Sequence, residues 1–151
     1  MKYYLAYGSN LSVEQMLYRC PTAIYVGTAD LEGYKLVFKG SLTGSYLTIE
    51  EGDGTVPVLV WKIKDDDEKA LDRYEGYPRF YDKKTMTVML HDLVTGSEIG
   101  EIEAMIYRMI GEREYGLPTR GYLKVCAEGY ERFSFDQAIL LRALNETANM
   151  V

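Results

Sequence analysis

The sequence is poor in the residue types from which metal sites and histidine-based catalytic groups are built. It has one histidine, His91, and two cysteines, Cys20 and Cys126, which lie far apart in the chain. This leaves no zinc-ligand spacing and no disulfide framework, so we predict no metal site. The two cysteines could pair, but reduced thiols in the core are the usual arrangement in a cytoplasmic protein. His91 falls in a strand-like run, where a structural role is expected.

Long apolar runs and an excess of basic residues are also absent. No run of about 20 apolar residues, the length that crosses a membrane, is present, and the first residues show no secretory-signal pattern. The 17 lysines and arginines are outnumbered by 23 aspartates and glutamates, whereas phosphate binding requires clustered basic residues. We therefore expect a cytoplasmic protein with neither a membrane nor a nucleic acid as its partner.

Tyrosine is the residue type in excess, with 14 copies in 151 residues. A buried tyrosine contributes apolar area together with a hydroxyl group that needs a partner. The excess therefore fits a cleft with a partly polar lining. The length of the chain and its 47% content of hydrophobic residues suit one globular domain over residues 1–151.

The pattern of apolar residues and turn residues divides the chain into short elements. It predicts strands over residues 2–7, 23–28, 34–38, 46–49, 56–63, 83–91 and 101–110, with a turn at 51–54. It predicts helices over residues 12–19, 65–74, 121–130 and from 134 or 136 to 148. Ser12 and Gln15 form a capping-box pattern, Asp65 or Asp66 is expected to cap the second helix, and Gly76 to end it.

Several of these strands follow one another without a helix between them, which favours an antiparallel or mixed sheet over a parallel one. We therefore predict an α+β fold. Its centre is a compact, mixed but mostly antiparallel β-barrel of about six or seven short strands, with three or four peripheral helices. No internal repeat, linker or low-complexity tract divides the chain.

The first stretch that can carry chemistry directly follows the first predicted strand. It reads Tyr7-Gly8-Ser9-Asn10-Leu11. Gly8 has no side chain to block a ligand from the backbone, and the helix that follows points its first N–H groups in the same direction. Glycine, serine and asparagine are also ordinary turn residues. The stretch alone leaves a simple turn and a cradle for an anion or a carbonyl oxygen both open.

The second stretch centres on Glu75, at the predicted end of the second helix. The negative end of the helix dipole and the surrounding aromatic side chains should both raise the pKa of this carboxyl group. A raised pKa suits proton transfer near neutral pH. The alternative is a surface glutamate paired with Arg73 or Arg79. A third stretch, 117–122, ends in Tyr122, which either belongs to a loop or presents its hydroxyl to a cleft.

Taken together, these stretches resemble the γ-glutamylcyclotransferase-like family, which includes AIG2-like and γ-glutamylamine cyclotransferase proteins. The resemblance rests on the early Y-G-S-N-L loop, the L-D-x-x-E-G at 71–76, an aromatic residue shortly after it and the late P-[ST]-x-x-Y at 118–122. It extends from Tyr3 to about Phe135. It implies a barrel-like β-fold with peripheral helices and an enzyme that needs no metal or organic cofactor.

The resemblance also implies roles for individual residues. Glu75 matches the catalytic acid and base, the loop 7–11 would hold the γ-glutamyl group, and Tyr81 and Tyr122 would be cavity tyrosines. The implied reaction closes a γ-glutamyl group into 5-oxoproline and releases an amine or amino acid. The partner would be a small γ-glutamyl molecule, and the protein a monomer or small homo-oligomer.

Two other functions stay open from the residues alone. The cavity could bind a γ-glutamyl or carboxylate metabolite without turning it over, as in a sensor protein. Alternatively, Cys20 or Cys126 could serve as the nucleophile of an amidase.

Overall fold

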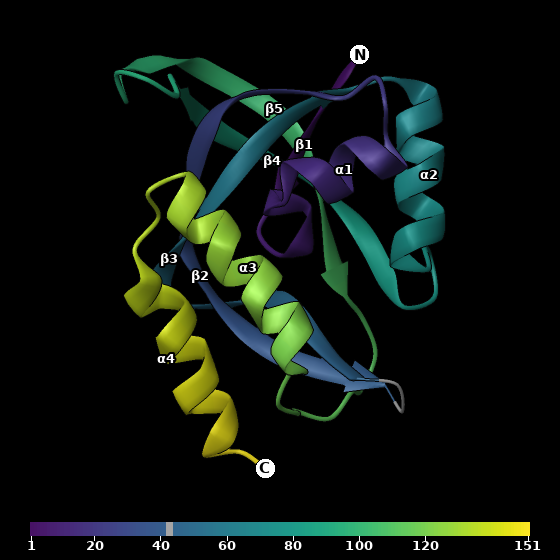
Figure 1. Ribbon diagram of the computed structural model, residues 1–151, viewed down its shortest axis with the longest axis vertical. Helices are drawn as coiled ribbons and strands as arrows, with labels where there is room; N and C mark the ends of the chain where they lie inside the picture. The colour runs from purple at the N-terminus through teal and green to yellow at the C-terminus, as the bar shows by residue number, and fades with distance from the viewer. Residues whose placement is uncertain (42–43) are drawn as a thin grey trace.

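The computed structural model describes residues 1–41 and 44–151, and its centre is a closed barrel (Figure 1). Five strands make up the barrel in the described part of the chain, in the order β1-β3-β2-β4-β5. Their bounds are β1 Lys2–Ala6, β2 Ile24–Ser41, β3 Gly44–Ile63, β4 Tyr81–His91 and β5 Glu98–Met109.

Antiparallel pairing dominates the barrel. β1 pairs with β3, β2 with β3, β4 with β5 and β2 with β4 in this way. The exception is β1 with β5, which run parallel through Tyr3↔Ala104 and Tyr4↔Met105. The seam between β2 and β4 consists of a single residue pair, Thr28↔His91. The predicted α+β fold with a mixed, mostly antiparallel barrel is confirmed.

The predicted number of strands was wrong, because four predicted strands merge into two. Residues 24–41 and 44–63 form one long antiparallel pair, with register shifts between Tyr25 and Gly27 and between Glu32 and Tyr34. Gly33, whose φ is +81°, lies at a register shift between Glu32 and Tyr34. The expected turn at 51–54 lies inside β3. The register shift leaves Gly33 opposite residues 52–54 and interrupts the pairing without ending either strand.

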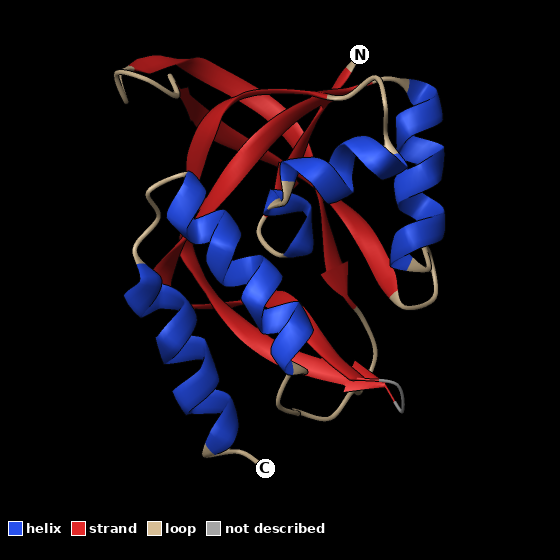
Figure 2. Ribbon diagram, in the orientation of Figure 1, coloured by secondary structure: helices blue, strands red, loops and turns tan. Residues whose placement is uncertain are grey.

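Four α-helices lie outside the strands in the described chain (Figure 2). They are α1 Val13–Arg19, α2 Asp65–Glu75, α3 Arg120–Arg132 and α4 Gln137–Ala148, and a short 3₁₀ turn, η1, spans Ser9–Leu11. Ser12 caps α1 and accepts the N–H of Gln15, as predicted. The cap of α2 was predicted wrongly: it is Lys64, whose N–H donates to the Asp67 carboxylate at 3.0 Å.

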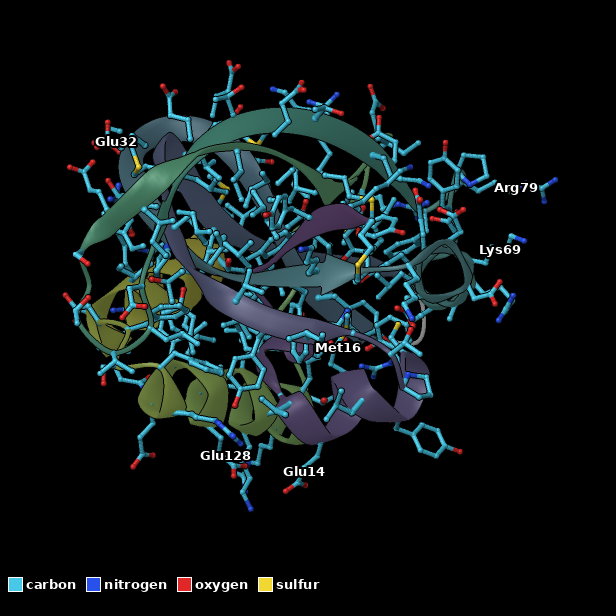
Figure 3. The ribbon with its side chains drawn as sticks, turned by 90° about the horizontal axis from the view of Figure 1, so that it is seen from above. Glu14, Met16, Glu32, Lys69, Arg79 and Glu128 are labelled. Carbon is cyan, nitrogen blue, oxygen red and sulfur yellow. The ribbon has the colours of Figure 1, made fainter. Side chains whose placement is uncertain are left out.

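The helices attach to the barrel through apolar side chains. In Figure 3, Met16 points from α1 toward the barrel, whereas Glu14, Lys69 and Glu128 point outward; Met16 is fully buried. α4 packs against β2, and α3 packs against η1. At the second contact a Cβ on Gly129 would overlap the Leu11 side chain. The absence of a side chain at this position lets α3 hold η1 in place.

No helix in the described chain is long and apolar enough to cross a membrane.

Candidate active site

A cavity of about 390 Å³ opens between the end of β1, the C-terminal end of α2 and the first turn of α3. This volume lies in the range of small-molecule sites in proteins. Seven of the eight predicted site residues line it: Tyr7, Gly8, Ser9, Asn10, Glu75, Tyr81 and Tyr122. These residues come from segments up to 115 positions apart, so the fold brings together stretches that the sequence showed only separately.

Glu75 is the last residue of α2, and the chain turns sharply after it. Gly76 adopts the left-handed conformation with φ +64° and ψ +34°. The N–H of Tyr77 then donates to the Asp72 carbonyl at 2.9 Å, which closes the last turn in the manner typical of a glycine cap. This ending places Glu75 on the cavity wall, where its side chain is partly buried.

Burial raises the pKa of Glu75 from its usual value near 4.5 to about 7, and the positive charge of Arg19 partly opposes this rise. Glu75 forms no salt bridge with any residue of the described chain. Arg79, one of the partners considered from the sequence, is exposed and points away from the protein (Figure 3). A carboxyl group in this setting can bind or release a proton near neutral pH.

The loop 7–10 forms another part of the cavity wall. The N–H of Leu11 donates to the Gly8 carbonyl and the N–H of Ser12 to the Ser9 carbonyl, both at 3.0 Å. The three preceding N–H groups, those of Gly8, Ser9 and Asn10, meet no acceptor in residues 1–41 and 44–151. A Cβ at Gly8 would lie 3.0 Å from the Tyr122 hydroxyl oxygen. Glycine therefore keeps the backbone open to the cavity here.

Asn10 is held from three sides. Its side-chain amide donates to the Tyr4 hydroxyl at 2.9 Å, and its side-chain oxygen accepts an N–H of Arg19 at 2.5 Å. The Trp61 indole N–H donates to its carbonyl at 3.1 Å. Next to it, the Ser9 hydroxyl hydrogen-bonds the Tyr74 hydroxyl at 2.9 Å. The loop is thereby fixed to β1, β3, α1 and α2.

Two of the predicted tyrosines hydrogen-bond the backbone of one residue of β3, Leu47. The Tyr81 hydroxyl donates to the Leu47 carbonyl at 2.8 Å, and the Leu47 N–H donates to the Tyr122 hydroxyl oxygen at 3.0 Å. The Tyr7 hydroxyl donates to the Tyr107 carbonyl at 2.7 Å. Burial raises the pKa of Tyr7, Tyr81 and Tyr122. These hydroxyls therefore keep their protons at neutral pH.

The structure does not bring Leu11 to the cavity. Its side chain is fully buried against α3, and its N–H is used within η1, so Leu11 acts as a packing residue. Sequence reasoning missed three tyrosines of the lining, Tyr4, Tyr46 and Tyr107, whereas Tyr74 and Phe80 belong to the aromatic residues expected around Glu75. The excess of tyrosine was the available signal, but it does not say which tyrosines meet.

The thiols and the histidine lie in other surroundings. Cys20 and Cys126 are free and buried, and burial raises the pKa of the Cys20 thiol to about 11 and that of Cys126 to about 12. Such thiols are poor nucleophiles. His91 ends β4, with Nδ1 3.0 Å from the Gly96 carbonyl oxygen. In the described chain no three His, Cys, Asp or Glu side chains cluster in a way that could hold a metal ion.

A comparison with protein families gives this arrangement a context. The model of the family described as "Gamma-glutamyl cyclotransferase, AIG2-like" matches residues 4–132, which include every residue of the cavity wall. The chain belongs to this family. The γ-glutamyl cyclotransferase family assignment agrees with the resemblance noted in the sequence.

Individual γ-glutamyl cyclotransferases resemble the chain over most of its length. The proteins named γ-glutamylcyclotransferase from Bos taurus and Homo sapiens are each 34% identical over 134 residues, covering 83% of this chain and 68% of theirs. A solved structure named γ-glutamyl cyclotransferase superimposes with a TM-score of 0.76 at 26% identity, covering 99% of this chain and 88% of the other.

Proposed function

We propose that this protein is a γ-glutamyl cyclotransferase that closes the γ-glutamyl group of a small substrate into 5-oxoproline, with Glu75 as general acid and base. The observation that carries the proposal is that Glu75 and the loop 7–10 line the same cavity. The names of the relatives from Bos taurus and Homo sapiens support the same chemistry.

The reaction is an intramolecular acyl transfer. The α-amino nitrogen attacks the γ-carbonyl carbon and forms the new C–N bond of a five-membered ring, and the original amide C–N bond breaks. A free α-amine has a pKa of about 7.7–8.0, so it is largely protonated at neutral pH and must lose a proton before it attacks. Glu75, with its pKa of about 7, accepts this proton and passes it to the departing nitrogen. The second proton that the ring nitrogen loses after the attack protonates the released amine.

The remaining task is to hold the substrate in a folded conformation. The N–H groups of Gly8, Ser9 and Asn10 are proposed donors for the α-carboxylate or for the oxyanion that develops on the γ-carbonyl oxygen. Tyr81 and Tyr122 form the wall beside them. Alignment of the two reacting groups can contribute roughly 7–11 kcal/mol to lowering the barrier, and one oxyanion donor about 3–4 kcal/mol.

A cytoplasmic location is part of the proposal. Both cysteines are buried free thiols, an arrangement typical of reducing compartments. We expect the protein to act as a monomer or small homo-oligomer on its own, without a nucleic acid or a membrane.

The test is the release of 5-oxoproline by the purified protein from a panel of γ-glutamyl amino acids and γ-glutamylamines, followed by mass spectrometry. Glu75→Gln keeps the size of the side chain but cannot carry the proton. We expect this variant to fold and to lose activity by at least about 100-fold, the range of general acid–base catalysis.

Glu131→Gln is the matched control. Glu131 also lies in the last turn of a helix, α3, but it is exposed to solvent. The activity of the Glu131→Gln variant should therefore equal that of the wild type. Release of 5-oxoproline by Glu75→Gln at the wild-type rate would show that another group carries the proton. Binding without any product in the wild-type protein would instead favour a sensor.

A further inference from the structure

Arg19, the last residue of α1, touches both walls of the cavity from behind. Its guanidinium donates one N–H to the side-chain oxygen of Asn10 at 2.5 Å and another to that of Gln15 at 3.1 Å. The same group lies over the Tyr74 ring, 3.6 Å from the ring centre. Asn10 belongs to the loop that lines the cavity together with Glu75, and Tyr74 directly precedes Glu75 in α2. One side chain therefore joins the two parts of the site.

We propose that Arg19 is a positioning residue for the cyclisation: its guanidinium fixes the loop 7–10 against the last turn of α2, so that the loop N–H groups and Glu75 face the same substrate. This rests on the proposed function, because it takes both groups as working parts. Arg19 is not among the residues that line the cavity. It therefore acts through Asn10 and Tyr74 and not by touching the substrate.

The geometry requires a guanidinium group. A planar fork can stack on an aromatic ring and still donate hydrogen bonds along its edge, whereas an ammonium group is a single point of charge. The Asn10 side chain is buried, and its amide nitrogen already donates to Tyr4. Loss of Arg19 would leave the amide oxygen without its charged donor in a buried place, where an unsatisfied acceptor is costly. The loop would then shift or become mobile.

Arg19 also acts on Glu75 through its charge. Four tyrosines around Glu75 are neutral at neutral pH, because burial raises their pKa. They come from β1, the loop, β4 and β5: Tyr4, Tyr7, Tyr81 and Tyr107. On α2 itself, Tyr74 hydrogen-bonds Ser9. Arg73 lines the cavity and carries a charge, but its side chain is exposed to solvent, and the charge that acts on the pKa of Glu75 is that of Arg19. The Arg19 charge lowers the pKa of Glu75 against the effect of burial. Removing this charge should therefore raise that pKa.

The experiment compares Arg19→Met, Arg19→Lys and a control, Arg142→Met. Arg142 also makes two side-chain hydrogen bonds, to Glu146 and Asp53, but it lies on α4 and does not line the cavity. The pH dependence of kcat/KM is measured with γ-glutamylglycine as the probe. The pKa of Glu75 is followed independently by ¹³C NMR of its carboxyl carbon, assigned by comparison with Glu75→Gln.

For Arg19→Met we expect kcat/KM to fall by about 10- to 100-fold from misplacement of the reacting groups. The acidic limb of the profile and the NMR pKa should both move upward by roughly half to one pH unit. Arg19→Lys keeps the charge, so its acidic limb should stay within about 0.2 pH units of the wild type, while kcat/KM still falls about 10-fold for lack of the fork. Arg142→Met should match the wild type in both measurements.

Two results would overturn the role of Arg19: an unshifted Glu75 pKa in Arg19→Met, or wild-type kcat/KM in Arg19→Lys. Thermal unfolding shows whether each variant is folded, and if Arg19→Met is not, the result for Arg19→Lys decides. Wild-type turnover reports on the proposed function, whereas the differences between variants report on Arg19. A wild-type protein that produces no 5-oxoproline would therefore contradict the proposed function. An active protein whose kcat/KM and Glu75 pKa do not depend on Arg19 would contradict only the role of Arg19.

Discussion

At the scale of single residues, the burial of Glu75 suits its proposed role in proton transfer but lowers the stability of the folded protein. Burial raises the pKa of Glu75 in the folded protein to about 7 from its ordinary value of 4.5. Below pH 4 the carboxyl group is protonated in both the folded and the unfolded state, and it does not affect the balance between them. As the pH rises toward 7 the unfolded state ionises first, so the free energy of unfolding falls. Above pH 7 the full penalty is present.

Glu75→Gln should therefore be more stable than the wild type at alkaline pH. The gain should reach at most about 3 kcal/mol at pH 8, since one pKa unit corresponds to about 1.4 kcal/mol and the side chain is only partly buried. At pH 4 the two proteins should unfold at nearly the same urea concentration. Urea unfolding at both pH values measures the difference. An equal gain at pH 4 and pH 8 would mean that the carboxyl group is not held in the protonated form by burial.

The sequence alone indicated some site residues and not others, for a physical reason. Glu75 and the loop 7–10 were indicated by local features, a helix end beside aromatic residues and a glycine after a strand. Tyr4 and Tyr107 have no local signal, because they meet only through the parallel pairing of β1 with β5; their rings lie 5.8 Å apart. Arg19 also has no local signal, because its contact with Tyr74 joins two different helices.

At the scale of elements, α2 is anchored so that its last turn faces the cavity. Asp72 accepts the Tyr107 hydroxyl at 2.5 Å, and Lys83 of β4 bridges Asp72 and Glu68 at 2.9 and 2.7 Å. Glu68, Asp72 and Glu75 lie on one stripe of the helix, because side chains three and four positions apart share a face. The end of the helix could be predicted from Gly76, but the anchoring depends on strands that follow later in the chain.

Gly76→Ala should damage both stability and turnover. The left-handed backbone disfavours alanine by about 1–2 kcal/mol, and the added Cβ would lie 3.1 Å from the Cβ of Phe80, a cavity residue. Gly96→Ala is the control, since Gly96 also has a positive φ, +72°, but nothing within 4 Å of an added Cβ. Both variants should lose similar free energy in urea unfolding. Only Gly76→Ala should lose kcat/KM, and equal activities would show that Glu75 tolerates a shift of the helix end.

The long strands show where local pattern reading fails at this scale. Glycine-rich segments predict turns when the chain is considered alone. In β2 and β3 the two strands pair on both sides of Gly33 and residues 52–54, with Glu32 opposite Thr55 and Tyr34 opposite Glu51. The decision between a turn and a bulge depends on the partner strand, which a single stretch of sequence does not contain. Whether a residue lies in a helix or a strand was therefore mostly predictable, but whether two neighbouring strand segments form one continuous strand was not.

At the scale of the whole molecule, the site exists because the barrel closes. The cavity wall takes residues from β1, β3, β4 and β5 as well as from α2 and α3. The closure depends on the parallel contact of β1 with β5 and on the seam between β2 and β4, which is a single residue pair. At the seam a Cβ on Gly27 would overlap the backbone carbonyl oxygen of His91. A glycine is required here for close approach of two strands.

Gly27→Ala should therefore weaken the protein without changing its chemistry. Overpacking between two backbones cannot be relieved by a side-chain rotation, so we expect a loss of about 1–3 kcal/mol in urea unfolding. Gly100→Ala is the control, because a Cβ there meets nothing within 4 Å, and its stability should stay within about 0.5 kcal/mol of the wild type. His91 and Tyr81 are at opposite ends of β4, so kcat/KM of folded Gly27→Ala should stay within about twofold. Wild-type stability in Gly27→Ala would mean that the seam is open in solution, and the five strands would then form an open sheet in the order β2-β3-β1-β5-β4.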